Sequence, residues 1–277
     1  MTLARTRDYQ WRIGRFAMVS LAALVLLFLI VPIFVVAPIS FSSSALLQFP
    51  PKQFSLRWYE TYFASSAWVD ATITSVKVGA IVTVVAVVLG LFSAVGLTRG
   101  RLRALAFIRA LLLAPLIVPV IIIAVALYYV FSLFRLNGTL TALIIGHTLL
   151  AFPYATVVIA ASLEKVDIRL EQAAIGLGAN PFRAFCRVTL PLIRSGITVA
   201  ALFSFLMSFD EAVMAIFVTG PSTTTLPKKM WDGIRFDLDP TIAAVSTILI
   251  AFSWLLILAA ELIRRRFGDS GDVKTPA

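Results

Sequence analysis

The stretch Arg169–Pro191, RLEQAAIGLGANPFRAFCRVTLP, is a polar interruption between two long apolar runs. Apolar residues at positions i, i+3, i+4 and i+7 form one stripe of a helix, namely Leu170, Ala173, Ala174 and Leu177. Asp167 suits the start of this helix, and Gly178 stands where a left-handed residue ends it. Asn180 and Pro181 then predict the N-cap and first position of a second short helix. We therefore expect two short helices with a tight elbow, too short to span a bilayer, that lie at the membrane surface and offer an apolar face.

Composition indicates an all-α membrane protein. Of 277 residues, 60% are hydrophobic and 14% are charged, whereas a soluble domain is nearer a quarter charged. Six apolar runs have the length of a membrane-spanning helix, at about 16–37, 72–97, 105–133, 140–161, 193–218 and 241–262. The expected organisation is an N-terminal segment 1–15, a six-span domain 16–263 with a surface loop at 164–192, and a tail 264–277.

The net charge of +10 is distributed in a way that argues against nucleic-acid binding. Of the 24 Lys and Arg residues, 17 fall before the first run, around 99–109, within 165–194, and after the sixth run. With six spans these positions share one side, and the positive-inside bias makes that side, with both termini, cytoplasmic. The single cysteine, Cys186, lies in the same loop and forms no internal disulfide.

Two apolar runs contain residues that are uncommon inside a membrane-spanning helix. Pro115 and Pro119, four residues apart in the third run, predict a kinked helix. His147, the only histidine, lies in the fourth run and could act as a proton relay. The second to fourth runs carry no acidic partner for it, which favours a packed or hydrogen-bonded histidine.

Asp210 and Glu211 are the only carboxylates well inside a predicted span. Each costs roughly 2.5–3.5 kcal/mol at the bilayer centre, so the pair needs compensation. On a continuous helix, neighbours in sequence point about 100° apart, so one carboxylate can face a cavity while the other meets a helix. The functional hypothesis is a cation path to which Ser208, Phe209 and Trp231 contribute a hydroxyl and aromatic faces. The alternative is a structural pair bonded to polar groups of this chain or a partner.

The surface loop resembles the "EAA" loop of ABC-importer permeases, the inner-membrane components of binding-protein-dependent transport. The family pattern is E-A-A, three residues, G, nine residues, then I-x-L-P. It is matched by Gln172-Ala173-Ala174, by Gly178 and by Val188-Thr189-Leu190-Pro191, with Glu171 beside the glutamate position. The resemblance implies that this loop docks into a groove of a cytoplasmic ATPase. The expected coupling residues are Glu171, Gln172, Ala173, Ala174, Gly178, Leu190 and Pro191. The alternative is an ordinary interfacial helix pair.

The later part of the chain looks like the spermidine/putrescine branch of these permeases. The resemblance rests on Ser208–Glu211, Phe217–Pro221, Thr225–Leu226–Pro227 with Met230 and Trp231, and Asp239–Thr247. It implies a bacterial inner-membrane subunit that works with a homologous permease, two ATPase subunits and a periplasmic binding protein. It also implies polyamine uptake through Asp210 and, less directly, Glu211. The stretch Ala114–Pro119 lacks the carboxylate that this branch can carry there, so opines and γ-aminobutyrate stay open as substrates.

Other functional classes find little support. The phosphate-binding pattern G-x-x-x-x-G-K-[ST] is absent, so we expect ATP hydrolysis by separate chains and no cofactor here. One histidine and one cysteine supply no metal-ligand cluster. Nothing resembles a nucleophile–base pair, so no catalytic residue is expected. An ion-coupled carrier with Asp210 and Glu211 as coupling site is the alternative transporter, although we see no inverted repeat.

Overall fold

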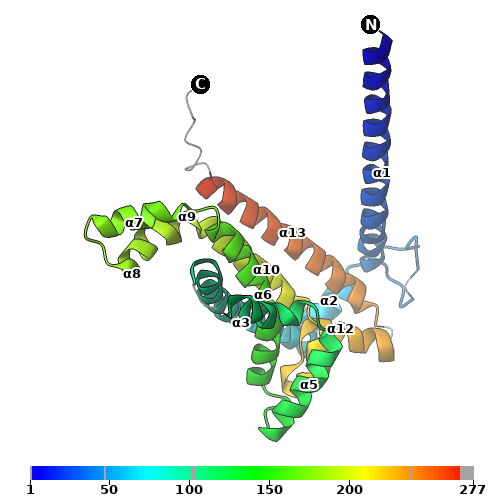
Figure 1. The fold of residues 1–277 in the computed structure, drawn as a ribbon. Helices are drawn as coiled ribbons and strands as arrows, with labels where there is room; N and C mark the ends of the chain where they lie inside the picture. The colour runs from blue at the N-terminus through cyan, green and yellow to red at the C-terminus, as the bar shows by residue number, and fades with distance from the viewer. Residues whose placement is uncertain (1, 47, 101–103, 238, 269–277) are drawn as a thin grey trace. The chain divides into compact units, whose positions relative to one another are not determined.

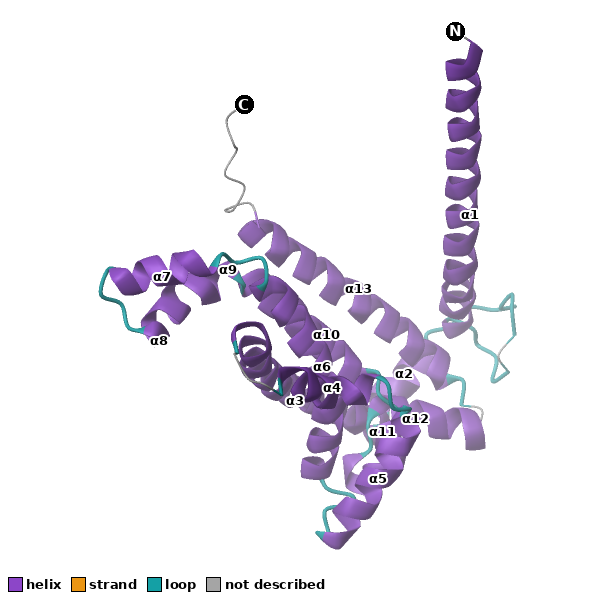
Figure 2. Cartoon of the chain, in the orientation of Figure 1, coloured by secondary structure: helices purple, strands orange, loops and turns teal. Residues whose placement is uncertain are grey.

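The computed structural model describes residues 2–46, 48–100, 104–237 and 239–268, which fold into helices and connecting loops (Figures 1 and 2). In the described part of the chain, the extended pairing is a single antiparallel bridge between Ser42 and Phe54. The predicted all-α membrane fold is confirmed. The chain divides into two compact units, one of residues 1–65 with 238–251 and one of residues 66–237 with 252–277.

The first unit contains α1 (Thr2–Ser40), α2 (Arg57–Ala64) and the first part of α13 (Thr241–Gly268). Pro32 and Pro38 lie inside α1, which continues through the first and ends two residues after the second. A hydrogen bond of 2.7 Å joins the hydroxyls of Ser40 and Tyr59, so the end of α1 is tied to α2. The segment between the first two apolar runs therefore contains a short helix.

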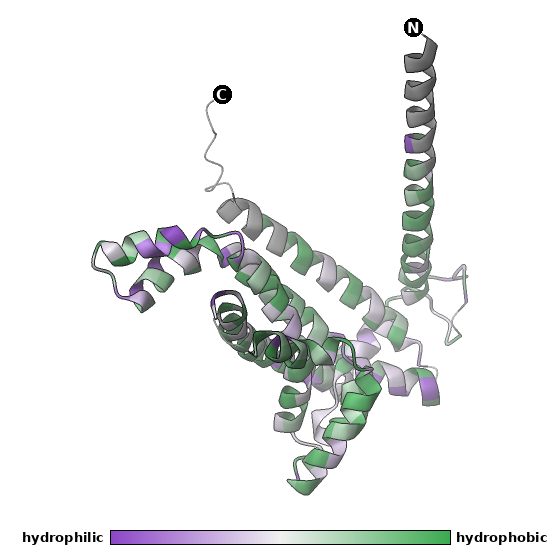
Figure 3. Cartoon of the chain, in the orientation of Figure 1, coloured by the Kyte–Doolittle hydropathy of each residue, from purple (hydrophilic) through white to green (hydrophobic). Residues whose placement is uncertain are grey.

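The second unit is built on α3 (Ser66–Arg99), α6 (Leu140–Leu163) and α10 (Arg194–Phe209), which pack against one another. Figure 3 shows hydrophobic residues along these helices. Small residues allow the close approach that stabilises helix pairs in membranes. A Cβ atom at Gly90 of α3 would lie 2.8 Å from the Cβ of Ala155 of α6, and one at Gly196 would collide with Ser162.

The third predicted span is broken rather than kinked. It consists of α4 (Leu105–Leu113), the 3₁₀ turn η1 (Ala114–Leu116) and α5 (Val120–Leu133), and its two halves meet at 97°. Pro115 lies in η1 and Pro119 immediately precedes α5. Each proline lacks the backbone N–H that a continuing helix would use, so the regular helical hydrogen bonds are interrupted at both positions.

Four described helices are long and apolar enough to cross a membrane, and the number rises to six if two bent pairs each count as one span. The four helical stretches are Met18–Ser40, Ser66–Arg99, Leu140–Leu163 and Thr241–Ala259. The bent pairs are Leu105–Leu116 with Val120–Leu133, and Pro181–Leu192 with Arg194–Phe209. All six predicted runs thus contain apolar helix, but the fifth begins with a 72° bend and the third contains one of 97°.

Candidate functional site: a surface elbow and a broken acidic helix

The surface loop folds as two short helices with the elbow that its sequence predicts. Asp167 accepts a hydrogen bond of 2.9 Å from the backbone N–H of Arg169 and begins α7 (Ile168–Gly176). Gly178 has φ +94°, and the N–H groups of Gly178 and Ala179 bond back to α7, which completes a Schellman motif. Asn180 caps α8 (Pro181–Ala184) by accepting from the N–H of Arg183 at 2.7 Å. The π-helix η2 (Phe185–Thr189) and α9 (Leu190–Leu192) follow.

The outer face of this elbow is apolar and uncovered. Leu177 is 89% exposed and Phe182 76% exposed, and Leu170 and Ile175 are about half exposed. Figure 3 shows that hydrophilic residues accompany them on α7 and α8. An exposed apolar cluster rimmed by polar residues marks a surface for interaction with a protein or a membrane.

The predicted coupling residues divide between two faces of the elbow. Gln172, Ala173, Gly178 and Pro191 are exposed, whereas Ala174 and Leu190 are half-buried. Glu171 is buried instead. One carboxylate oxygen pairs with Arg99 at the end of α3, and the other accepts from the hydroxyl of Thr189 at 2.9 Å. The sequence did not indicate this arrangement, because Arg99 lies 72 residues before Glu171.

Asp210 and Glu211 do not lie on a continuous helix, so the 100° separation expected for neighbours on one helix does not apply to them. Helix α10 ends at Phe209, and α11 (Val213–Val218) begins after a break of three residues. Asp210 is the C-cap residue that follows α10, and it is exposed. Glu211 is half-buried, and its Oε1 atom accepts from the N–H of Met214 in the first turn of α11 at 3.0 Å.

Two of the predicted path residues, Ser208 and Phe209, are buried in contacts with other side chains of this chain. Ser208 is 5% exposed, and Nδ1 of His147 lies 3.0 Å from both its carbonyl oxygen and its hydroxyl. The hydrogen-bonded interpretation of His147 is thus confirmed. Phe209 is 8% exposed and lies beside the rings of Phe205 and Phe252, at centroid distances of 5.4 and 5.6 Å.

Trp231, the last predicted path residue, lies on α12 (Leu226–Asp232) and is 47% exposed. Within the described residues, no hydrogen bond, ion pair or ring contact joins it to Asp210. The four residues Ser208, Phe209, Asp210 and Glu211 thus lie at the break, and no interaction with Asp210 ties Trp231 to them in the described part of the chain.

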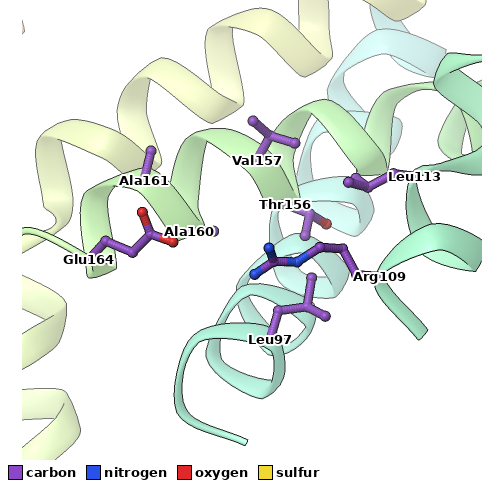
Figure 4. A pocket seen from close by; sticks show the side chains of 8 residues that line it. All are labelled: Leu97, Arg109, Leu113, Thr156, Val157, Ala160, Ala161 and Glu164. Atoms are coloured by element: carbon purple, nitrogen blue, oxygen red, sulfur yellow. The ribbon is translucent and has the colours of Figure 1, made fainter. Parts of the chain in front are cut away.

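A pocket of about 220 Å³ opens at another place, beside the ends of α3 and α6 (Figure 4). Its walls come from α3, α4 and α6, and none of its residues belongs to the predicted path or coupling set. The lining residues are Leu97, Arg109, Leu113, Thr156, Val157, Ala160, Ala161 and Glu164. Among the described residues there is no group of three side chains that could hold a metal ion.

The sequence profile of the family "Binding-protein-dependent transport system inner membrane component" matches residues 86–269. The chain belongs to this family. The family expected from the elbow motif is thereby confirmed, and a carrier that works without a binding protein is set aside.

Relatives and a solved structure agree with this membership. The chain is 29% identical over 264 residues to the spermidine/putrescine transport system permease protein PotC of Escherichia coli K12, with 95% of this chain and 100% of PotC covered. It is 32% identical to the putrescine transport system permease protein PotI of the same strain, covering 86% and 90% of the two chains. A chain of the bacterial alginate ABC transporter, solved with an alginate-bound periplasmic protein, shares the fold with TM-score 0.70 and 15% identity, covering 98% of this chain and 99% of that chain.

Proposed function

We propose that this chain is a permease subunit of an ATP-driven importer that moves a small cationic amine, with putrescine and spermidine as first candidates. The substrate passes from a periplasmic binding protein to the cytoplasm by alternating access. The names of PotC and PotI support this substrate class. The observation that carries the proposal is the exposed carboxylate of Asp210 at the break between α10 and α11.

The two carboxylates at the break differ in their electrostatic surroundings. The carboxyl end of a helix carries a partial negative charge, so Asp210 at the end of α10 adds charge of the same sign. A bound cation would offset both charges, as happens at the ends of broken helices in other transporters. Glu211 lies at the positive amino end of α11 and already accepts a backbone hydrogen bond. We therefore assign Asp210 to the substrate and Glu211 to the support of α11.

The elbow supports the assignment of partners. Its exposed Leu177 and Phe182 fit an apolar groove of a soluble protein, and this chain carries no phosphate-binding loop of its own. A pair of ATPase subunits would occupy this face, while a second homologous permease completes the path. The concentration of Lys and Arg beside the elbow and near both ends of the chain supports a cytoplasmic position for all three.

The Schellman elbow suits mechanical coupling because its geometry is fixed by backbone bonds. Gly178 holds a left-handed conformation, and α7 and α8 are capped on both sides of it. Closure of the ATPases on ATP would move this elbow as a unit. The chain connects the elbow directly to α6 and α10, so their movement would switch the break at Asp210 between the two sides of the membrane.

A second substrate class is favoured by the turn η1. Its sequence, Ala114-Pro115-Leu116, offers no carboxylate at the place where the polyamine branch can carry one. A single acidic group at Asp210 would suffice for a compound with one ammonium group, such as γ-aminobutyrate or an opine.

Uptake of radiolabelled putrescine into proteoliposomes that contain the complete transporter tests the proposal. We expect ATP-dependent uptake by the wild type, and a KM raised roughly 10- to 100-fold by Asp210→Asn, because a charged hydrogen bond is lost. Glu211→Gln is the matched control, since it removes a charge but keeps the oxygen that caps α11. Unchanged kinetics in Asp210→Asn would remove Asp210 from the path, and uptake of γ-aminobutyrate without putrescine would favour the second substrate class.

A further inference from the structure

Arg99, Glu171 and Thr189 form a buried polar cluster that joins α3, α7 and η2. Both oxygens of the Glu171 carboxylate are occupied, one by the guanidinium of Arg99 and the other by the hydroxyl of Thr189. The side chains of Arg99 and Glu171 are 22% and 11% exposed, and Thr189 is fully buried. The carboxylate therefore faces the interior of this chain and is unavailable to a partner on the outer face of the elbow.

Arg99 is well placed to hold this carboxylate. It is the last residue of α3, where a positive charge is stabilised by the negative end of the helix. Its guanidinium carbon also lies 5.9 Å from the centre of the Phe185 ring, in the first turn of η2. Removing one partner of such a pair leaves an uncompensated charge, so separating Arg99 from Glu171 is costly.

The cluster joins the elbow to the end of α3. The chain itself connects the elbow to α6 and α10, but α3 ends 72 residues before Glu171. Beside the pair lies a hollow of about 340 Å³ that separates the end of α3 from the segment joining α6 to α7. Its lining residues are Thr98, Arg99, Leu163, Glu164, Val166 and Ile168. Arg99 thus borders a place where side-chain packing is incomplete, and its ion pair with Glu171 holds it to the elbow.

We propose that Glu171 is a positioning residue that locks α3 to the elbow, so that movement of the elbow is transmitted to α3 through Arg99. This inference rests on the proposed function, because it assigns a route for the coupling between ATP hydrolysis and transport. In it, Glu171 acts within this chain, and the ATPase is contacted by the exposed residues of the elbow instead. Helix α3 then moves together with α6 and α10, against which it packs.

The test measures putrescine uptake per ATP hydrolysed in proteoliposomes of the complete transporter, normalised to the amount of assembled complex. Glu171→Gln and Arg99→Gln should each lower this ratio roughly 3- to 10-fold while ATP hydrolysis continues. The double variant should lose no more than either single variant, because both remove the same link. Arg99→Lys, which keeps the charge, should restore part of the ratio that is lost in Arg99→Gln. If Glu171→Gln fails to assemble, the comparison of Arg99→Lys with Arg99→Gln tests the lock, and equal losses in the two would overturn it.

Two exposed residues near the cluster supply matched controls. Arg109→Gln and Glu164→Gln make the same changes of charge outside the ion pair, and we expect the wild-type ratio from both. A wild-type ratio in Glu171→Gln, or losses that add in the double variant, would overturn the lock. A wild-type complex that takes up no substrate with ATP would instead overturn the proposed function, so the two failures are distinguishable.

Discussion

His147 shows how one side chain supports the broken helix at the candidate site. A carbonyl oxygen only accepts hydrogen bonds, so Nδ1 of His147 carries the proton in its 3.0 Å contact with the carbonyl of Ser208. That carbonyl lies in the last turn of α10, where the helix offers no N–H partner because it ends at Phe209. His147 therefore satisfies a buried backbone group that the break leaves open.

We expect His147→Leu to lower the free energy of unfolding by about 1–3 kcal/mol, because the carbonyl of Ser208 becomes unpaired inside the protein. His147→Asn should recover much of the loss, since the Asn amide can donate from nearly the same position. Thermal unfolding of the purified protein in detergent measures both. Tyr154→Phe, on the same helix and 37% exposed, is the control. Equal stability of His147→Leu and the control would show that the hydrogen bond contributes nothing.

Residues that act on their near neighbours could be predicted from the sequence. Asp167, Gly178 and Asn180 each cap a helix through groups one to four residues away, and all three have the predicted conformation. The bonds from His147 to Ser208 and from Arg99 to Glu171 span 61 and 72 residues. Sequence spacing carries no information about such pairs, because they depend on how whole helices pack.

At the scale of elements, the sequence predicted a distortion of a membrane-spanning helix where prolines lie inside it. Pro115 and Pro119 predicted a kink in the third span, whereas the structure has a break of 97° there, an angle that depends on the packing of both halves. The break after Phe209 contains no proline or glycine. A signal in the sequence was Glu211, since the start of a helix offers this carboxylate a backbone N–H that a continuous helix does not.

The pairing of α3 with α6 depends on a glycine at the contact. A Cβ at Gly90 would lie 2.8 Å from that of Ala155 and 3.0 Å from the backbone of Thr156, which cannot move aside. We expect Gly90→Leu to destabilise the protein by about 1–3 kcal/mol or more through overpacking. The same substitution at Gly96, where nothing lies within 4 Å of the added Cβ, should be nearly neutral. Thermal unfolding in detergent compares them, and similar losses at both positions would contradict a specific contact.

At the scale of the whole molecule, composition and motif spacing were enough to predict the membrane fold and the family. They could not show which face of the elbow is open, because the stripe of Leu170, Ala173, Ala174 and Leu177 fits either a core or a docking surface. The structure leaves Leu177 and Phe182 exposed and turns Glu171 inward. In the mechanism that we propose, outer contact and inner lock are therefore separate functions of one short segment.

This separation predicts that changes to the outer face affect assembly, whereas changes to the lock affect coupling. Leu177→Asp and Phe182→Asp should each reduce co-purification of the ATPase subunits with a tagged permease by roughly tenfold, since a buried charge replaces an apolar anchor. Leu46→Asp places the same charge on another exposed apolar residue, 66% exposed in the loop before α2, and should leave co-purification unchanged. Glu171→Gln should also retain the ATPase. Full retention in both elbow variants would mean that the ATPase binds elsewhere, since each variant removes one of the two most exposed apolar side chains of this face.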